Sequence, residues 1–117
     1  MNESERPIVY VVQDTDLNLS KAHAFGRLEP LLARGRNITM ATQPVLRELR
    51  QLLRGYTDRD YLLLIGDPAA IALAVHVASE VNSGRVKVLK YDREMRGYYE
   101  LKIDFYGKGW PGEKENN

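Results

Sequence analysis

The segment from residue 61 to residue 81 constrains the fold of this chain most strongly. It opens with a short apolar run (61–65), passes through a Gly-Asp-Pro turn (66–68) and continues into an alanine-rich apolar stretch. A buried strand, a tight turn, an Asp67 helix cap, a helix-starting proline and a buried helix account for this order of residue types. The segment therefore predicts an α/β fold.

Length and composition set broad limits on the rest of the chain. The 117 residues correspond to one domain with a modest core. Seventeen basic and 16 acidic residues give a net charge of +1, so overall charge neither favours nor excludes a nucleic-acid partner. The chain has no cysteine, which excludes disulfides, a thiol nucleophile and a cysteine-bound metal.

The ends of the chain bear on its location. The first six residues are polar and partly acidic, unlike a secretory signal, and no apolar stretch is long enough to span a membrane. We therefore expect a cytoplasmic protein. We also expect a single domain over residues 1–106, followed by a flexible tail over residues 107–117 that is rich in glycine and charge.

The remaining elements follow from periodicity and turn residues. Strands are expected at 8–12, 27–33 and 38–40, an amphipathic helix at 44–54, and a C-terminal hairpin of strands 85–91 and 98–106 joined by a turn at 92–97. Pro30 should either confine its strand to a sheet edge or break it. Thr42 or Gln43 should cap the amphipathic helix, with Gly55 at its end. Ser20 should cap a short helical turn that Gly26 ends.

These elements predict a small mixed sheet with two main helices, a truncated Rossmann-like α/β architecture. The strands around 8–12 and 61–65 should be parallel, and the hairpin should be antiparallel, while the order of the strands in the sheet stays open. In sheets of this kind ligands bind outside the carboxyl ends of the strands.

Three carboxylates follow the two central strands. Asp14 and Asp16 come after the first strand, and Asp67 comes after the strand at 61–65. Oxygen ligands gathered at one sheet edge could hold Mg²⁺ for phosphoryl transfer or nucleotide binding. The alternative is that Asp67 only caps the helix while Asp14 and Asp16 lie in a solvated loop.

Basic and aromatic residues mark a candidate binding surface for nucleic acid or for another partner. Arg47, Arg50 and Arg54 form a stripe on the amphipathic helix. The further candidates lie in a loop and in the hairpin: Arg59, Arg93, Arg96, Tyr91 and Tyr98. Arginines with interleaved tyrosines can grip a phosphate backbone and stack bases. The alternative is an ordinary solvated surface, because acidic residues are mixed in.

Four segments carry a resemblance to a known group of proteins. They are Ile8 to Gln13, Phe25 to Leu28, Asp60 to Ala70, and Asn82 to Asp92. With them the chain resembles a group of small, uncharacterised bacteriophage proteins over about residues 8–106. The resemblance implies a phage accessory protein that acts in an infected bacterial cell, and it transfers no catalytic or binding residues.

We therefore expect a non-enzymatic binding module without a cofactor, whose partner is nucleic acid or a host protein that handles it. The Mg²⁺-dependent activity described above is one alternative. A structural homo-oligomer is another, because the helix at 68–81 has little polar surface and the C-terminal strand offers an open edge. Pairing through either would give a symmetric dimer.

Overall fold

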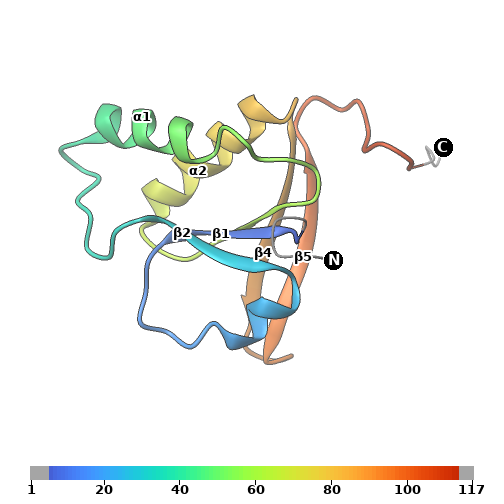
Figure 1. Cartoon of the computed structure of the whole chain (residues 1–117), viewed down its shortest axis with the longest axis horizontal. Coiled ribbons are helices and arrows are strands. Elements are labelled where there is room, and N and C mark those ends of the chain that lie inside the picture. The colour runs from blue at the N-terminus through green and yellow to red at the C-terminus, as the bar shows by residue number, and fades with distance from the viewer. Residues whose placement is uncertain (1–5, 114–117) are drawn as a thin grey trace.

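The computed structural model of the chain describes residues 6–113 and shows one mixed sheet with helices packed on it (Figure 1). The elements in chain order are β1 (Ile8–Gln13), the 3₁₀ helix η2 (Ser20–Ala24), β2 (Arg27–Leu32), α1 (Thr42–Leu52), β3 (Tyr61–Leu63), α2 (Pro68–Val81), β4 (Arg85–Asp92) and β5 (Gly97–Asp104). The predicted α/β class is confirmed.

The five strands lie in the order β2-β1-β3-β4-β5. The first four are parallel, and β5 pairs antiparallel with β4, with Asp92 opposite Gly97 and Arg85 opposite Asp104. The predicted parallel direction of the two central strands and the predicted C-terminal hairpin are therefore both confirmed, and the structure adds that the two central strands are neighbours. Pro30 lies on β2, at the edge of the sheet, where a missing N–H costs no ladder bond.

Strand order places the topological switch point between β1 and β3. From β1 the chain first adds β2 on one side and then β3 on the other side. The two connections therefore leave the carboxyl ends of β1 and β3 in opposite directions. The gap between them is the ligand-binding position in sheets of this order.

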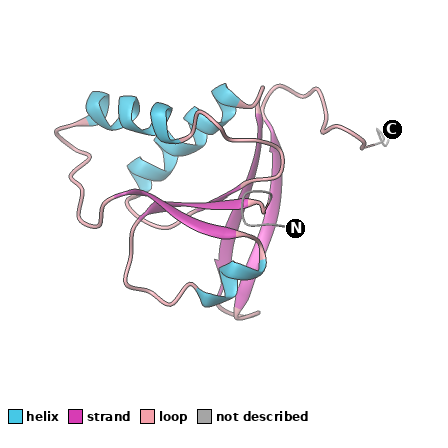
Figure 2. Cartoon of the chain, viewed as in Figure 1, coloured by secondary structure: helices cyan, strands magenta, loops and turns pink. Residues whose placement is uncertain are grey.

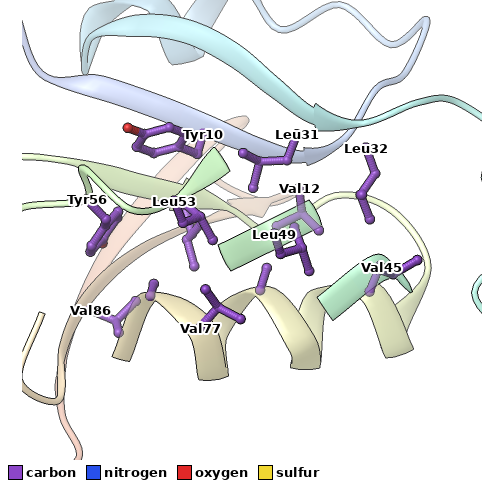
Figure 3. Close-up of a cluster of buried hydrophobic side chains, with 14 of the residues drawn as sticks. Tyr10, Val12, Leu31, Leu32, Val45, Leu49, Leu53, Tyr56, Val77 and Val86 are labelled. Atoms are coloured by element: carbon purple, nitrogen blue, oxygen red, sulfur yellow. The ribbon is translucent and has the colours of Figure 1, made fainter. Parts of the chain in front are cut away.

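Both α-helices cover the same face of the sheet (Figure 2). Tyr10 and Val12 of β1 point into this layer, where they meet Leu49 and Leu53 from the α1 side and Val77 of α2 (Figure 3). All five side chains are at most 5% exposed. The helical spacing of the apolar residues predicted this buried face of α1.

The opposite face of the sheet is covered by η2 and its flanking loops. Val9, Val11, Leu63 and Leu89 form its buried floor together with Ala22 of η2. Aromatic rings surround that floor, and they contact one another edge to face: Phe25 with Tyr61 at 5.6 Å, Phe25 with Tyr98 at 6.5 Å, and Tyr91 with Tyr98 at 5.3 Å between centroids. Large rings thus cover part of a face that carries no α-helix.

The helix starts test the capping predictions. Asp67 caps α2, because its Oδ1 atom accepts from the N–H of Ala69 at 2.7 Å, and Pro68 is the first helical residue. The prediction of Thr42 or Gln43 as cap of α1 is wrong. That helix begins at Thr42, and the residue before it is an alanine with no capping side chain.

Other local predictions also need correction. No strand forms at residues 38–40. Ile38 is buried in the core and its carbonyl accepts from Ala41 N–H in a turn, because one apolar side chain is packed there without a neighbouring strand to pair with. Ser20 is the first residue of η2, with no capping bond at that end. The cap of the α1 C-terminus is Leu53, so Gly55 lies further along the turn than predicted.

The amino ends of the strands are tied together by buried polar groups. The Tyr56 hydroxyl donates to the Lys87 carbonyl at 3.3 Å and accepts from the Lys87 N–H at 3.1 Å. Burial raises the pKa of Tyr56 well above the ordinary tyrosine value, so the hydroxyl stays protonated. The Asp60 carboxylate accepts from the N–H groups of Ile8 and Thr57, each at 2.9 Å.

The segment after β5, predicted to be a flexible tail, lies against the strand as far as residue 113. Trp110 is only 9% exposed, and its ring centre lies 5.3 Å from Lys102 Nζ. Lys102 Nζ also lies 3.3 Å from Glu113. The Asp104 carboxylate accepts from backbone N–H groups of this segment, which lowers its pKa. Residues 114–117 of the predicted tail lie outside the described residues.

Candidate functional site

Gln13, the last residue of β1, fills the switch point. Its side chain is buried, at 8% exposed. Its Nε2 atom donates to the carbonyl oxygens of Ala33 at 3.2 Å and Arg36 at 3.4 Å, and its Oε1 atom accepts from the N–H of Asp67 at 2.9 Å. The amide therefore links the loop after β2 to the turn before α2. A side chain of the protein itself occupies the gap where such sheets bind ligands.

Gly66 allows this packing. Its φ angle is +124°, and a Cβ atom built there would lie 2.5 Å from the Cβ of Gln13. Only glycine accepts both the backbone conformation and the close approach at low cost. The glycine of the Gly-Asp-Pro turn is thus explained by its contact with Gln13, without reference to a ligand.

Two of the three candidate metal ligands line an open crevice of about 500 Å³ beside Gln13. They are Asp14 and Asp67, and they face Arg34 and Arg36 across it. Asp16 lies in the same loop, with a carboxylate oxygen 3.9 Å from the Arg34 guanidinium. The predicted common sheet edge is present, because β1 and β3 are parallel neighbours.

The bonds of these carboxylates are local. The Asp14 Oδ1 atom accepts from the N–H of Thr15 at 2.9 Å, as in a polar turn, and Asp67 caps α2. Within residues 6–113, no group of three or more histidine, cysteine or acidic residues is placed to hold a metal ion. The crevice is thus lined by two carboxylates and two guanidinium groups.

The arginine stripe lies on the outer side of the helical layer. Arg47 and Arg50 are exposed on α1, and Arg54 is exposed in the turn that follows it. Arg50 Nε lies 3.4 Å from the Glu80 carboxylate of α2, so this cation is partly compensated. Arg59 is exposed in the loop before β3. These four residues approach the amino end of the sheet.

The hairpin candidates lie elsewhere. Arg93 and Arg96 are exposed in the turn between β4 and β5, and the Arg96 carbonyl accepts from Lys21 Nζ beside η2. In Figure 1 this turn is at the bottom of the molecule and α1 is at the top. The structure therefore brings Arg93 and Arg96 together with Tyr91 and Tyr98, and it does not join them to the α1 stripe in one surface.

The hairpin tyrosines form the wall of a hollow, which we call the tyrosine hollow. It has a volume of about 420 Å³ and is lined by the loop before η2, the end of β3 and the hairpin: Leu17, Asn18, Leu19, Ser20, Lys21, Ile65, Tyr91 and Tyr98. Leu17 is 63% exposed and Tyr91 is 46% exposed, while Tyr98 is held by Phe25 and Tyr91. A fixed ring and two exposed apolar side chains therefore face solvent together.

Sequence reasoning found the two tyrosines of this hollow and missed Leu17, Ile65 and Gln13. The loop at 14–19 reads as polar, and nothing in its pattern tells that Leu17 faces a hairpin more than 70 positions away. Gln13 did leave a signal in the sequence, because it is a polar residue placed directly after the predicted buried strand and before a turn.

The fold defines a small open α/β domain whose switch point holds a buried glutamine beside an open crevice, and whose exposed apolar hollow lies on the face opposite the two α-helices. A family model matches residues 7–105, and the chain belongs to the Phage Pam3 gp32-like protein family. This match confirms the resemblance to a group of phage proteins. Comparison with curated proteins and with solved structures gave no match.

One further property bears on location. The helices described between residues 6 and 113 are too short or too polar to cross a membrane.

Proposed function

We propose that this member of a phage protein family is an accessory protein that binds another protein in the cytoplasm of the infected cell, through the tyrosine hollow. The observation that supports the proposal is the location of the exposed apolar side chains. Two of the ten large hydrophobic residues that are exposed between residues 6 and 113, Leu17 and Tyr91, line this hollow together with the apolar side chain of Ile65 and the ring of Tyr98. Clustered exposed hydrophobics are typical of protein-binding surfaces.

The chemistry of the hollow supports a protein partner. Leucine, isoleucine and tyrosine side chains form its walls, and Lys21 lies at its rim with Arg93 and Arg96 in the nearby turn. A buried aromatic or aliphatic anchor of a partner fits such walls, and acidic groups beside the anchor would meet the cations. We expect the partner to be a host protein that handles nucleic acid or a phage protein.

The distribution of cations favours protein over nucleic acid. Several arginines already have acidic neighbours: Arg36 with Glu48 at 2.6 Å, Arg85 with Asp58 at 2.8 Å, and Arg50 with Glu80 at 3.4 Å. The other candidate arginines are spread over three places: Arg47 and Arg54 on and just after α1, Arg59 in the loop before β3, and Arg93 and Arg96 in the hairpin turn. Phosphate-backbone binding depends on many cations neutralising phosphates along one track.

Nucleic-acid binding by α1 is a second candidate function. Arg47 and Arg54 are exposed, and no acidic side chain pairs with either among residues 6–113. With Arg50 they would present three charges to a backbone. Changing Arg47, Arg50 and Arg54 together to Glu should abolish salt-dependent binding of single-stranded DNA or RNA while the fold is kept. Binding that persists would remove this surface from consideration.

Capture from host lysate tests the proposed function. Tagged wild-type protein should retain a partner that survives nuclease treatment, and Tyr91→Ser or Leu17→Asn should lower its recovery about ten-fold, as expected for an interface anchor. Met40→Asn is the matched control, since Met40 is 86% exposed and lies outside the hollow. Recovery that is unchanged in Tyr91→Ser, or that disappears with nuclease, would contradict the proposal.

A further inference from the structure

The outer edge of β5 is open. β5 is the last strand of the sheet, and within residues 6–113 no strand or helix lies along its outer side (Figure 2). The N–H of Phe105 donates to the carbonyl of Gly84 at 2.8 Å, in continuation of the β4–β5 register. Backbone groups of successive residues in an antiparallel strand point to alternate sides. Even-numbered residues, Glu100 and Lys102 among them, therefore turn their N–H and C=O groups to the open edge.

The side chains along this edge are apolar on the face that carries the helices. Tyr99 and Leu101 are 45% and 48% exposed, and Phe105, one residue beyond the strand, is 55% exposed. The other face of the strand carries Glu100 and Lys102. A long edge strand with exposed apolar residues invites pairing with another strand unless it is protected.

We infer that the partner of this edge is a second copy of the chain, paired antiparallel through β5 with Leu101 opposite the partner's Leu101. In an antiparallel pair of identical strands, the twofold axis passes either through one residue position, which then lies opposite its own copy, or midway between two residue positions. Because the outward backbone groups belong to even-numbered residues, hydrogen bonding requires even positions to pair with even positions. Among registers that overlap most of the strand, the axis can then lie at Tyr99, Glu100, Leu101 or Lys102.

Charge selects one of these four registers. An axis at Glu100 places two carboxylates opposite each other, and an axis at Lys102 places two ammonium groups opposite each other. An axis at Tyr99 places Lys102 opposite the partner's Arg96. Directly opposed like charges destabilise an antiparallel pair. With the axis at Leu101, Glu100 faces the partner's Lys102, and Lys102 faces the partner's Glu100. The strand is therefore complementary to itself in this register.

Contacts within each copy hold these two charges in place. Lys102 Nζ lies over the Trp110 ring and 3.3 Å from Glu113. Burial raises the pKa of Tyr61, and the nearby Glu100 carboxylate, which accepts a hydrogen bond from this tyrosine, raises it further. Both charged side chains thus lie over the same face of the strand, where they can meet their counterparts across the axis.

The same register also places the exposed apolar residues at one end of β5 beside those at the other end of the partner's β5. Gly97 pairs with the partner's Phe105, so the hairpin turn of one copy reaches the end of β5 in the other. The turn carries Met95, which is 52% exposed, and the end of β5 carries Phe105 and Tyr106, which are 55% and 54% exposed. Pairing therefore places exposed apolar residues of one copy beside those of its partner. Both helical layers then lie on one face of a continuous sheet.

Sedimentation velocity of the full chain over a range of concentrations tests this inference. Wild-type protein should form a dimer. Glu100→Lys and Lys102→Glu should each weaken dimerisation about ten-fold or more, because each creates two like-charge pairs at the axis. The two variants mixed in equal amounts should form a mixed dimer, and the double variant Glu100→Lys/Lys102→Glu should dimerise again.

Lys90→Glu is the matched control. Lys90 is exposed on β4, which is paired on both sides in its central part, and its charge reversal should leave the dimer unchanged. Circular dichroism of each variant checks that the monomer is folded, and the mixing experiment gives an answer even if one single variant is partly destabilised. A monomeric wild-type chain, or dimers that both single variants leave intact, would overturn the inference.

This interface uses the outer edge of β5 and not the tyrosine hollow. A monomeric chain whose partner capture still depends on Tyr91 would reject the dimer and retain the proposed function. If the chain forms the dimer but its capture of a partner does not depend on Tyr91, the dimer is retained and the proposed function is rejected.

Discussion

The side-chain oxygen of Gln13, at the end of β1, accepts a hydrogen bond from the backbone N–H of Asp67, the residue that caps α2, at a distance of 2.9 Å. The two residues are 54 positions apart and lie on the two sides of the switch point. The bond joins the connections that diverge from β1 and β3. The Gln13 side chain fills the space between the two strand ends in this way, and the open crevice beside it adjoins the tyrosine hollow, because Leu17 and Ile65 line both.

Replacing Gln13 with Ala should destabilise the domain by about 2–3 kcal/mol. The change removes hydrogen bonds to partly buried backbone groups of Asp67 and Ala33 and leaves the Gln13 position without a side chain that fills the space between them. Urea denaturation followed by circular dichroism measures the loss. Gln51→Ala is the matched control, because Gln51 is exposed on α1 and should change stability by less than about 0.5 kcal/mol. Equal effects of the two changes would contradict the role assigned to Gln13.

Gly66→Ala should also destabilise, by about 2 kcal/mol or more. The new methyl group would meet the Cβ of Gln13, and the φ of +124° strains any residue with a side chain. At Gly55 the added methyl group meets nothing within 4 Å and the φ angle lies outside the strained range, so Gly55→Ala serves as the control. A Gly66→Ala protein with wild-type stability would show that the turn does not pack as described.

Asp58 should make stability depend on pH. Its carboxylate accepts from Arg85 Nε and Asn82 Nδ2, both at 2.8 Å, and the Arg85 hydrogen bond is the main reason why its pKa is lowered on folding. A carboxyl with a lowered folded pKa stabilises the fold above its unfolded pKa of about 4, and this contribution disappears as the pH falls through the lower folded value.

The measurement is the urea midpoint of Asp58→Asn against wild type at several pH values. The variant should be less stable at pH 7, and the difference should begin to shrink as the pH falls below about 4. Asp16→Asn is the control, because Asp16 is 82% exposed and lies 3.9 Å from its arginine. A difference that stays constant through the whole acid range in which the protein remains folded would argue against the charge of Asp58 as the cause.

Magnesium should not stabilise the protein. The crevice that holds Asp14 and Asp67 also holds Arg34 and Arg36, and a divalent cation would be repelled by both guanidinium groups. Adding millimolar Mg²⁺ or EDTA should leave the melting temperature unchanged within about 1 °C, because only binding to the folded state would raise it. A rise of several degrees that Asp14→Asn removes would restore the metal-dependent alternative.

The sequence predicted what depends on neighbouring residues. Asp67 and Pro68 are adjacent to the helix they start, and the α2 boundaries followed from them. The capping of α1 was not predictable, because the helix begins beside an alanine and its first turn is held by packing of Val45 against the sheet. Tertiary burial outweighs a missing cap, and burial is not visible in a short window of sequence.

The candidate site was predictable only in part for the same reason. The spacing of Arg47, Arg50 and Arg54 fixed their common face, and the hairpin pattern brought Tyr91 opposite Tyr98. The separation of these two groups depends on strand order, which follows from long-range pairing. The contact of Leu17 with the hairpin depends on how a loop of irregular structure crosses the sheet end.

Photo-crosslinking in infected or phage-protein-expressing host cells tests the central claim most directly. A photoreactive phenylalanine derivative is placed at Tyr91, inside the hollow, or at Met40, which is exposed elsewhere. We expect position 91 to form a discrete nuclease-resistant adduct with a protein other than a second copy of the chain, and position 40 to form none. The same adducts from both positions, or none from position 91, would contradict a protein-binding role for the hollow.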